Sequence, residues 1–193
     1  MEAIGSAAVM AKGINFVYFK KYVLQAEGER FWNALLESAP ETDQSVWRMP
    51  VLSAWYPFEM FKCMFFRYAE AKGQNRDADL SRIYEYIARH SLSTIHRLLF
   101  KATASPHFVL SNYPKLWGQF FKDGAVEVLE NANQRCRFCF VLPEIFLDWL
   151  PPACTGYTRM AVTLAGGRDV QIRESARERR GGLHFVSYEA SWR

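Results

Sequence analysis

Apolar residues recur at the spacing of an amphipathic helix through the first 121 residues of the chain. This pattern predicts helices separated by residues that break or cap them. Gly28 separates the first two, Asp79 stands where a cap of the fourth is expected, and Pro114 is placed to interrupt the fifth. The predicted helices cover residues 17–24, 29–38, 58–72, 79–104 and 107–121.

The pattern changes to alternation from Asp123 onward. Four strands are predicted after this point, and the first two form a hairpin around residues 131–133. A helix over residues 144–165, interrupted by Pro151-Pro152, separates the two pairs of strands. The strands are marked by Val126 and Val128, by residues 136–141, by Val170 and Ile172, and by residues 183–192.

This order of elements predicts an α+β fold in which a helical layer packs on a four-stranded antiparallel sheet. We expect residues 1–10 to form a loose lead and residues 11–193 to form a single ligand-binding-like domain. A chain of 193 residues, 50% of them apolar, can bury a core without disulfides. The densest charged run, residues 173–180, mixes Arg with Glu and is interpreted as a solvated loop.

Charge and hydropathy exclude several classes of protein. The net charge of +4 is not concentrated in one patch, so a nucleic-acid partner is not expected. No stretch approaches the roughly 18 apolar residues of a membrane span, and the N-terminus does not resemble a signal peptide. The four cysteines are too scattered for a disulfide framework. A cytoplasmic location is therefore expected.

No catalytic or metal-binding signature is recognisable, so no catalytic residue and no metal ligand is predicted. Cys136 and Cys139 form a CxxC motif within a predicted strand, where positions three apart face opposite sides. His90 lies near the edge of the apolar stripe of the predicted long helix, and His96 lies on another face. His90 is a candidate haem ligand, with a buried hydrogen-bonded histidine and a surface histidine as alternatives.

The aromatic-rich stretch from Trp55 to Tyr68 is the best candidate for a site. It predicts an apolar pocket that accepts an acyl chain, an aromatic effector or a flat tetrapyrrole. Core packing and a protein interface are the alternatives for the same side chains. The candidate ligand-binding residues are Trp55, Tyr56, Phe61, Phe65, Arg67 and Tyr68, with Arg67 and Tyr68 placed to orient a polar head group.

A set of glycine and aromatic positions carries a family resemblance over residues 11–192. The positions are Lys12-Gly13, Gly28 with Trp32, Tyr113-Pro114 with Trp117, Gly124, Gly156, and Gly182 through Phe185 to Trp192. With this order of elements, the chain resembles the superfamily that groups haem nitric-oxide-binding domains, vinyl-4-reductase domains and core subunits of the TRAPP vesicle-tethering complex. Within that group it is most similar to a bacterial paralogous family of unknown function. The resemblance implies a fold of ligand-binding and partner-binding proteins.

Two departures from the family patterns bear on cofactors. Haem-binding members carry a Tyr-x-Ser-x-Arg clamp, and the nearest string here, Tyr157-Thr158-Arg159, has the wrong spacing. Zinc-containing members place cysteines near the last hairpin, and residues 174–184 contain none. We therefore expect no cofactor, with haem as the alternative.

Three functions are compatible with these observations. The first is a non-enzymatic ligand-binding or sensory domain that binds an apolar or aromatic small molecule and regulates a partner protein, in a homodimer or with another protein. The second is a scaffold or regulator in a complex of the small-GTPase or tethering type, without a small ligand. The third is a tetrapyrrole-handling protein or reductase. Enzyme activity is left uncertain, and the absence of a visible catalytic group argues against it.

Overall fold

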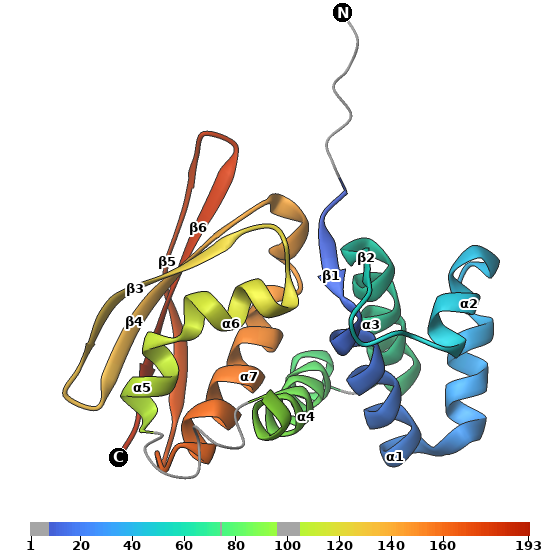
Figure 1. Cartoon of the computed structure of the whole chain (residues 1–193), viewed down its shortest axis with the longest axis horizontal. Coiled ribbons are helices and arrows are strands. Elements are labelled where there is room, and N and C mark those ends of the chain that lie inside the picture. Colours follow the sequence, from blue (N-terminus) through green and yellow to red (C-terminus); the bar gives the residue numbers. More distant parts are fainter. Residues whose placement is uncertain (1–7, 74, 96–104) are drawn as a thin grey trace, which may run out of the picture.

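The computed structural model describes residues 8–73, 75–95 and 105–193, which form two regions that meet at helix α4 (Figure 1). The N-terminal region is helical and carries a two-stranded ribbon, and the C-terminal region is a four-stranded antiparallel sheet covered by helices. The predicted α+β fold is confirmed. Its elements are β1 (Met10–Lys12), α1 (Gly13–Glu37), α2 (Glu41–Arg48), β2 (Trp55–Pro57), α3 (Phe58–Lys72), α4 (Arg76–Ile95), α5 (Pro106–Ser111), α6 (Tyr113–Phe120), β3 (Ala125–Ala132), β4 (Arg135–Leu142), the 3-10 turn η1 (Glu144–Phe146), α7 (Leu150–Leu164), β5 (Gln171–Arg180) and β6 (Leu183–Ser191).

The sheet has the strand order β3-β4-β6-β5, and every neighbouring pair is antiparallel. The turn between β3 and β4 is formed by Asn133 and Gln134, with φ of 53° and 56°. Gly181 and Gly182 take φ of 57° and 82° between β5 and β6. Two successive residues with positive φ are typical of a two-residue type I′ turn, whose twist matches that of the strands it joins. The hairpin turn thus lies later than predicted, because Asn131 still pairs within β3.

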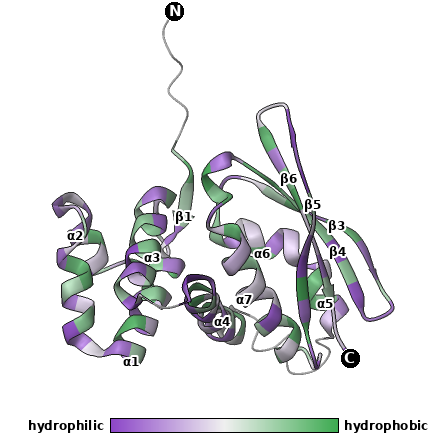
Figure 2. Cartoon of the chain, turned by 180° about the vertical axis from the view of Figure 1, so that it is seen from behind, coloured by the Kyte–Doolittle hydropathy of each residue, from purple (hydrophilic) through white to green (hydrophobic). Residues whose placement is uncertain are grey.

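One face of the sheet is buried beneath the helices. Strands β4 and β6 alternate along their length, and their inward side chains are Cys136, Phe138, Phe140, Leu142, Val186, Tyr188 and Ala190. Strand β5 differs, because its side chains are exposed from Arg173 onward and are mostly hydrophilic (Figure 2). The expectation of a solvated loop over residues 173–180 was therefore wrong. These residues form an edge strand that is rich in Arg and Glu. Charged side chains on an edge strand discourage its pairing with another chain.

Helices α4 and α7 form the closest helix pair, and a glycine permits their approach. A Cβ atom added at Gly156 of α7 would lie 2.0 Å from the carbonyl oxygen of Ser81 in α4. No residue with a side chain can occupy this crossing without moving one of the helices. The crossing therefore sets how the C-terminal region sits against the helix that joins it to the N-terminal region.

Two short strands in the N-terminal region have no counterpart in the predicted elements. Met10 belongs to β1, although residues 1–10 are predicted as a loose lead, and Trp55 and Tyr56 belong to β2. The strands pair in an antiparallel ribbon in which Lys12 lies opposite Trp55. Three residues are too few to reveal a period of two. Gly28 interrupts α1 as predicted, with φ of 83°.

Helix boundaries agree with the prediction where turn residues bracket them, as at Phe58–Lys72. Helix α4 begins at Arg76, so Asp79 lies inside it, and the Asn75 side chain accepts the N–H of Ala78 at 3.3 Å. The predicted continuation over 96–104, including His96, lies outside the described residues.

Proline residues mark helix starts in the C-terminal region. The predicted helix over 107–121 is divided into α5 and α6, and Pro114 lies in the first turn of α6. Pro151 and Pro152 lie in the first turn of α7 and do not interrupt a helix. The N–H groups of a first turn have no partner within the helix, so proline, which lacks an N–H, is tolerated there. No helix in the described ranges combines the length and hydropathy that crossing a bilayer requires.

Candidate functional site

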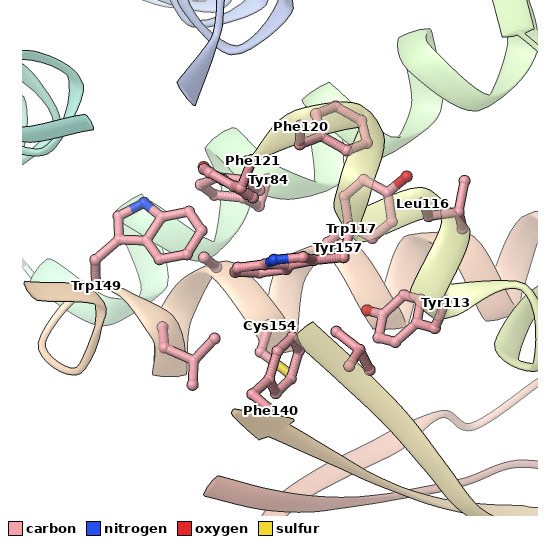
Figure 3. Close-up of a pocket in the computed structure, with 13 residues that line it drawn as sticks. Tyr84, Tyr113, Leu116, Trp117, Phe120, Phe121, Phe140, Trp149, Cys154 and Tyr157 are labelled. Atoms are coloured by element: carbon pink, nitrogen blue, oxygen red, sulfur yellow. The ribbon is translucent and has the colours of Figure 1, made fainter. Parts of the chain in front are cut away.

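An apolar cavity of about 50 Å³ lies between helices α4, α6 and α7 and the inner face of the sheet (Figure 3). Each lining side chain is at most 9% exposed. The cavity therefore lies mostly within the folded chain and is partly open to its surface. The lining residues are Tyr84, Tyr113, Leu116, Trp117, Phe120, Phe121, Val126, Phe140, Trp149, Leu150, Ala153, Cys154 and Tyr157.

Two helical stripes build most of the cavity wall. Both follow the i, i+3, i+4, i+7 spacing, which places four side chains on one face of a helix. The sheet closes the opposite side with Val126 and Phe140, and α4 adds Tyr84. The stripe of α6 is Tyr113, Leu116, Trp117 and Phe120, and the stripe of α7 is Leu150, Ala153, Cys154 and Tyr157.

Three buried polar atoms of the lining residues make no hydrogen bond of good geometry. They are the hydroxyl oxygens of Tyr84 and Tyr157 and the indole nitrogen of Trp149. The Tyr84 hydroxyl interacts with the Trp149 indole, and the Tyr157 hydroxyl interacts with Ser91. The hydroxyl of Tyr113 is hydrogen-bonded to Thr158. A buried polar group without a well-formed hydrogen bond loses part of its stabilisation, so these three groups are only partly satisfied within the chain.

The titratable groups of the cavity are held neutral. Burial raises the pKa of the Tyr84 and Tyr113 hydroxyls well above its ordinary value, and it also raises the pKa of the Tyr157 hydroxyl. Burial likewise raises the pKa of the Cys154 thiol. Such groups donate hydrogen bonds or contribute apolar surface, but they do not serve as bases or anionic ligands near neutral pH.

Comparisons with known proteins identify the fold. No protein-family model matches the sequence, and no curated protein matches it. Solved structures of H-NOX proteins do match. An Fe(II) unliganded H-NOX mutant from K. algicida superposes with a TM-score of 0.72 at 12% identity, over 94% of this chain and 96% of that one. An oxygen-binding H-NOX domain related to soluble guanylate cyclases, in its oxygen complex, gives 0.62 at 13% identity over 94% and 95%. The chain has the H-NOX fold.

The residues of this H-NOX fold do not fit a haem in the cavity. A volume of about 50 Å³ is far below the ~300–1,000 Å³ of small-molecule pockets. The described lining residues include no histidine and no cationic side chain to pair with propionates. Thiolate and phenolate groups can bind haem iron, but burial keeps Cys154 and the three tyrosines protonated. The aromatic lining would have to rearrange before a tetrapyrrole could enter.

The structure places the residues that were predicted to form one ligand site in the N-terminal region. Phe61 and Phe65 are buried in the N-terminal region, where Phe61 contacts Phe16 and Trp47 at centroid distances of 5.3 and 6.2 Å. Neither residue lines the cavity of Figure 3. A ligand site at Phe61 and Phe65 stays a prediction.

The other predicted residues lie nearer the surface of the N-terminal region. Trp55 and Tyr56 are half-buried in β2. Arg67 donates to the carbonyl oxygen of Ser38. Tyr68 is buried, but its hydroxyl group reaches a polar cluster at the end of α3. Tyr56 and Tyr68 belong to the same cluster of rings as Phe61 and Phe65, because the ring centroid of Tyr56 lies 5.0 Å from that of Phe16 and the ring centroid of Tyr68 lies 6.0 Å from that of Phe19.

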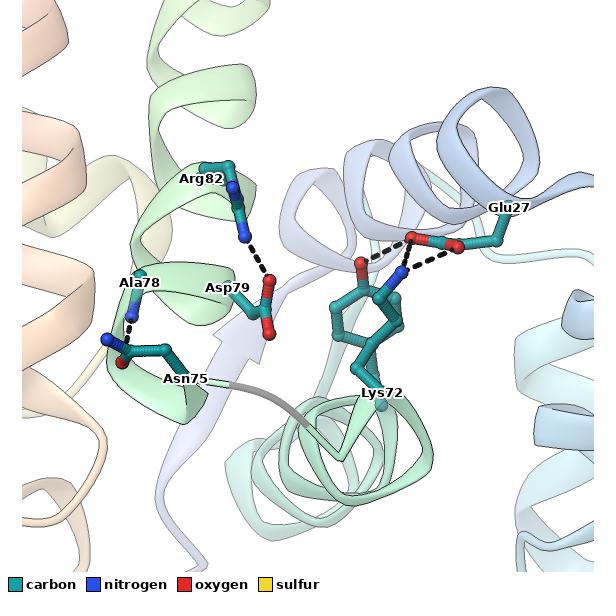
Figure 4. A network of polar contacts seen from close by, with 7 residues as sticks. Glu27, Lys72, Asn75, Ala78, Asp79 and Arg82 are labelled. Atoms are coloured by element: carbon teal, nitrogen blue, oxygen red, sulfur yellow. Dashed lines mark hydrogen bonds and ion pairs between the residues drawn. The ribbon is translucent and has the colours of Figure 1, made fainter.

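Polar side chains of helices α1, α3 and α4 lie around one pocket (Figure 4). Tyr68 donates to Glu27 at 2.9 Å, and Lys72 pairs with the same carboxylate at 2.9 Å. Arg82 pairs with Asp79, which is buried and whose Oδ2 atom has no partner. These residues line a polar pocket of about 330 Å³. The bonds to Glu27 tie α3 to α1, and the pair of Asp79 and Arg82 lies within α4.

The remaining candidates do not form a metal or redox site. The Nδ1 atom of His90 lies 2.8 Å from the carbonyl oxygen of Tyr86, and His90 is not among the residues that line the cavity. Cys136 faces the core and Cys139 the other face of β4, as predicted, and burial raises the pKa of Cys136 to about 12. Within the described ranges, no group of three or more His, Cys, Asp or Glu residues is placed to hold a metal ion.

Sequence reasoning missed the cavity, although signals for its residues were present. Tyr113 and Trp117 were noted only as positions of family resemblance, and Trp149 was not singled out. The stripes of α6 and α7 follow helical spacing, and this could have been recognised. That the two stripes face each other across Phe140 depends on the tertiary fold.

Proposed function

We propose that this protein is a non-enzymatic ligand-binding domain of the sensor type, which binds a small apolar molecule in the cavity of Figure 3 and regulates a partner protein. The observation that carries the proposal is an apolar cavity that contains polar groups at Tyr84, Trp149 and Tyr157 without well-formed hydrogen bonds. Ligand sites combine apolar walls with a few polar groups that orient the ligand. The H-NOX fold of oxygen-binding and Fe(II)-containing proteins is consistent with this function.

The size of the cavity limits the ligand. A water molecule needs roughly 10–15 Å³ of the same kind of volume, and a dry engineered cavity of about 150 Å³ accepts benzene or xenon. A cavity of about 50 Å³ is therefore suited to a molecule of a few heavy atoms. A larger aromatic or acyl ligand would have to displace a side chain such as that of Trp149.

Helix α7 offers a route from the ligand to a partner. Trp149 and Leu150, at its start, line the cavity, and Gly156 packs directly on Ser81 of α4. A ligand that displaces Trp149 would shift α7 against α4, and α4 contacts the N-terminal region. We propose that a partner protein or a second copy of the chain reads this shift. Four free thiols are consistent with action in the reducing cytoplasm.

The alternatives rank below this function for physical reasons. The tyrosines and the cysteine of the cavity are neutral, so they supply no general base for a reductase. A scaffold of the tethering type requires no cavity, and it predicts a defined protein complex without a small molecule. Kinship with vinyl-4-reductase and TRAPP domains and with the bacterial paralogous family remains part of this proposal.

Xenon binding tests the site directly. Xenon should shift the NMR signals of methyl groups in Val126 and Leu150, because it enters dry apolar cavities. Ala153→Val places two methyl groups into the cavity and should abolish the shifts. Thr163→Val introduces the same side chain on the exposed face of α7 and should preserve them. Unchanged spectra of the parent protein under xenon would contradict the site.

The natural ligand is tested on protein purified from its own host. Native mass spectrometry should show a co-purifying small molecule that Ala153→Val eliminates. A Soret absorption band would show that the lining rearranges around a haem and would overturn the size limit. A clean apo mass in a dimer or with a bound protein would favour the scaffold alternative.

A further inference from the structure

The loop between α2 and β2 exposes three large apolar side chains within four residues. Met49, Val51 and Leu52 are 82%, 55% and 51% exposed. Elsewhere in the described chain, large apolar side chains with this level of exposure occur singly, as at Leu129. Single exposed apolar residues need no explanation, but a contiguous group is typical of a contact surface.

The loop is held firmly by the core of the N-terminal region. The Gly13 N–H donates to the carbonyl oxygen of Ala54 at 2.8 Å, and the Val51 N–H donates to the hydroxyl of Tyr56 at 3.0 Å. A Cβ atom at Gly13 would lie 1.9 Å from the Val51 carbonyl oxygen, so the chains meet backbone to backbone. The apolar side chains are thus presented in a fixed arrangement, which lowers the entropic cost of binding.

Cationic side chains surround the loop. Trp55 lies on strand β2, which follows the loop. The side-chain nitrogens of Lys12 and Lys122 lie 5.5 and 5.0 Å from the centroid of its ring. Arg48 precedes the loop and is exposed, and Lys20 donates to the Arg48 carbonyl oxygen. Asp123, next to Lys122, accepts the N–H of Met10 at 3.0 Å, and the exposed Glu59 pairs with Lys62 at 3.8 Å. The surface therefore combines protruding aliphatic side chains, a half-buried tryptophan and a positive surround.

We propose that this loop docks the protein on the surface of an anionic membrane. Protruding aliphatic side chains fit a deformable apolar layer and need no preformed pocket in a partner. Tryptophan is favoured at the boundary between lipid and water, and cationic side chains are attracted to anionic headgroups. Met49, Val51 and Leu52 enter the headgroup and acyl boundary, while Lys122 and Arg48 contact lipid phosphates. The association is peripheral and reversible.

Vesicle co-sedimentation of the full chain tests the proposal. The protein should pellet with vesicles of phosphatidylglycerol and phosphatidylcholine, and much less with phosphatidylcholine alone. Leu52→Asp should lower the partition coefficient at least about tenfold, since a charge in the apolar layer costs more than about 1.4 kcal/mol. Leu129→Asp, at a side chain 52% exposed on β3, is the matched control and should change it less than about twofold.

Charge reversal provides a second arm. Arg48→Glu should weaken pelleting with anionic vesicles. Lys115→Glu makes an equal charge change at an exposed residue of α6 and should have a smaller effect. Absence of pelleting with anionic vesicles, or equal loss in the two leucine variants, would overturn the proposal. A concentration-dependent dimer that Leu52→Asp dissociates, without vesicle binding, would assign the loop to self-association. Xenon binding should be unchanged in Leu52→Asp, which separates this proposal from the cavity.

Discussion

The two regions of the molecule each contain a dense cluster of aromatic rings. In the part of the chain that the structure describes, an apolar cavity lies within the C-terminal cluster, whereas the pocket beside the N-terminal cluster is polar. In the N-terminal region, Phe61 and Phe65 stack at a centroid distance of 5.8 Å and Phe61 reaches Phe16 at 5.3 Å. In the C-terminal region, Trp117 and Trp149 lie 6.5 Å apart and line open space. The number of aromatic residues in a segment therefore does not distinguish a packed core from a pocket.

The two clusters also differ in how well the polar groups at their edges are hydrogen-bonded. The hydroxyl of Tyr68, at the edge of the N-terminal cluster, is bonded to Glu27. The hydroxyl of Tyr84 interacts with the indole of Trp149 at the edge of the C-terminal cluster, but the contact lacks good hydrogen-bond geometry. The Tyr68 hydroxyl is therefore better satisfied within the chain than the Tyr84 hydroxyl, which a ligand can satisfy.

The largest expected effect tests whether the N-terminal cluster is packed core. Phe61→Ala should lower the free energy of unfolding by about 3–5 kcal/mol, because the ring is fully buried among other rings. Chemical denaturation measures the change. A loss below about 1 kcal/mol, together with loss of ligand binding, would place Phe61 in a pocket, as the sequence suggests.

Alkaline pH should act most strongly on the C-terminal region. Burial raises the pKa of Tyr84, Tyr113 and Tyr157 in the folded state, whereas each phenol titrates near 10 when unfolded. Above that pH the unfolded chain releases protons that the folded chain retains, so stability falls as pH rises. Each phenol contributes about 1.4 kcal/mol per pH unit, or about 4 kcal/mol for the three.

Denaturation between pH 9 and pH 11 measures this slope, and Tyr84→Phe provides the control. Removing one of the three phenols should reduce the slope by about 1.4 kcal/mol per pH unit. An unchanged slope in Tyr84→Phe would show that its hydroxyl ionises equally in both states.

The crossing of α4 and α7, where the two regions meet, should be sensitive to a single methyl group. Gly156→Ala should destabilise by about 1–3 kcal/mol, because the added Cβ lies 2.0 Å from the Ser81 carbonyl oxygen. Gly118→Ala in α6 meets no atom within 4 Å and should stabilise by up to about 1 kcal/mol. Thermal unfolding of the two variants compares them, and equal shifts would mean that the helices slide apart without cost.

Local signals in the sequence predicted the elements, and the pairing of distant segments decided the rest. Helix α3 was predicted with its observed bounds, because Pro57 precedes it and Gly73 ends it. The opposite faces of Cys136 and Cys139 followed from the period of a strand. The start of β5 was predicted from Val170 and Ile172, but its continuation over 173–180 was missed, because charged residues indicate solvent and an edge strand is also exposed to solvent.

The cavity could not have been predicted in this way. Whether the stripes of α6 and α7 fill the space over Phe140 depends on side-chain volumes and on the crossing at Gly156. Neither quantity has a period along the chain. The same holds for Phe61 and Phe65, whose aromatic pattern is compatible with a pocket and with a core.

The smallest single effect is expected for Tyr84→Phe, and Tyr68→Phe makes it a comparison of the two regions, because each variant removes one hydroxyl oxygen. Tyr68→Phe should destabilise by about 1.5–3 kcal/mol, since its hydroxyl donates to the carboxylate of Glu27 at 2.9 Å. Tyr84→Phe should change the stability by less than about 0.5 kcal/mol, because the contact of its hydroxyl with Trp149 lacks good hydrogen-bond geometry. Urea denaturation at neutral pH measures both changes. Equal destabilisation would mean that the Tyr84 hydroxyl makes a full hydrogen bond in solution, and this group would then no longer support a ligand site.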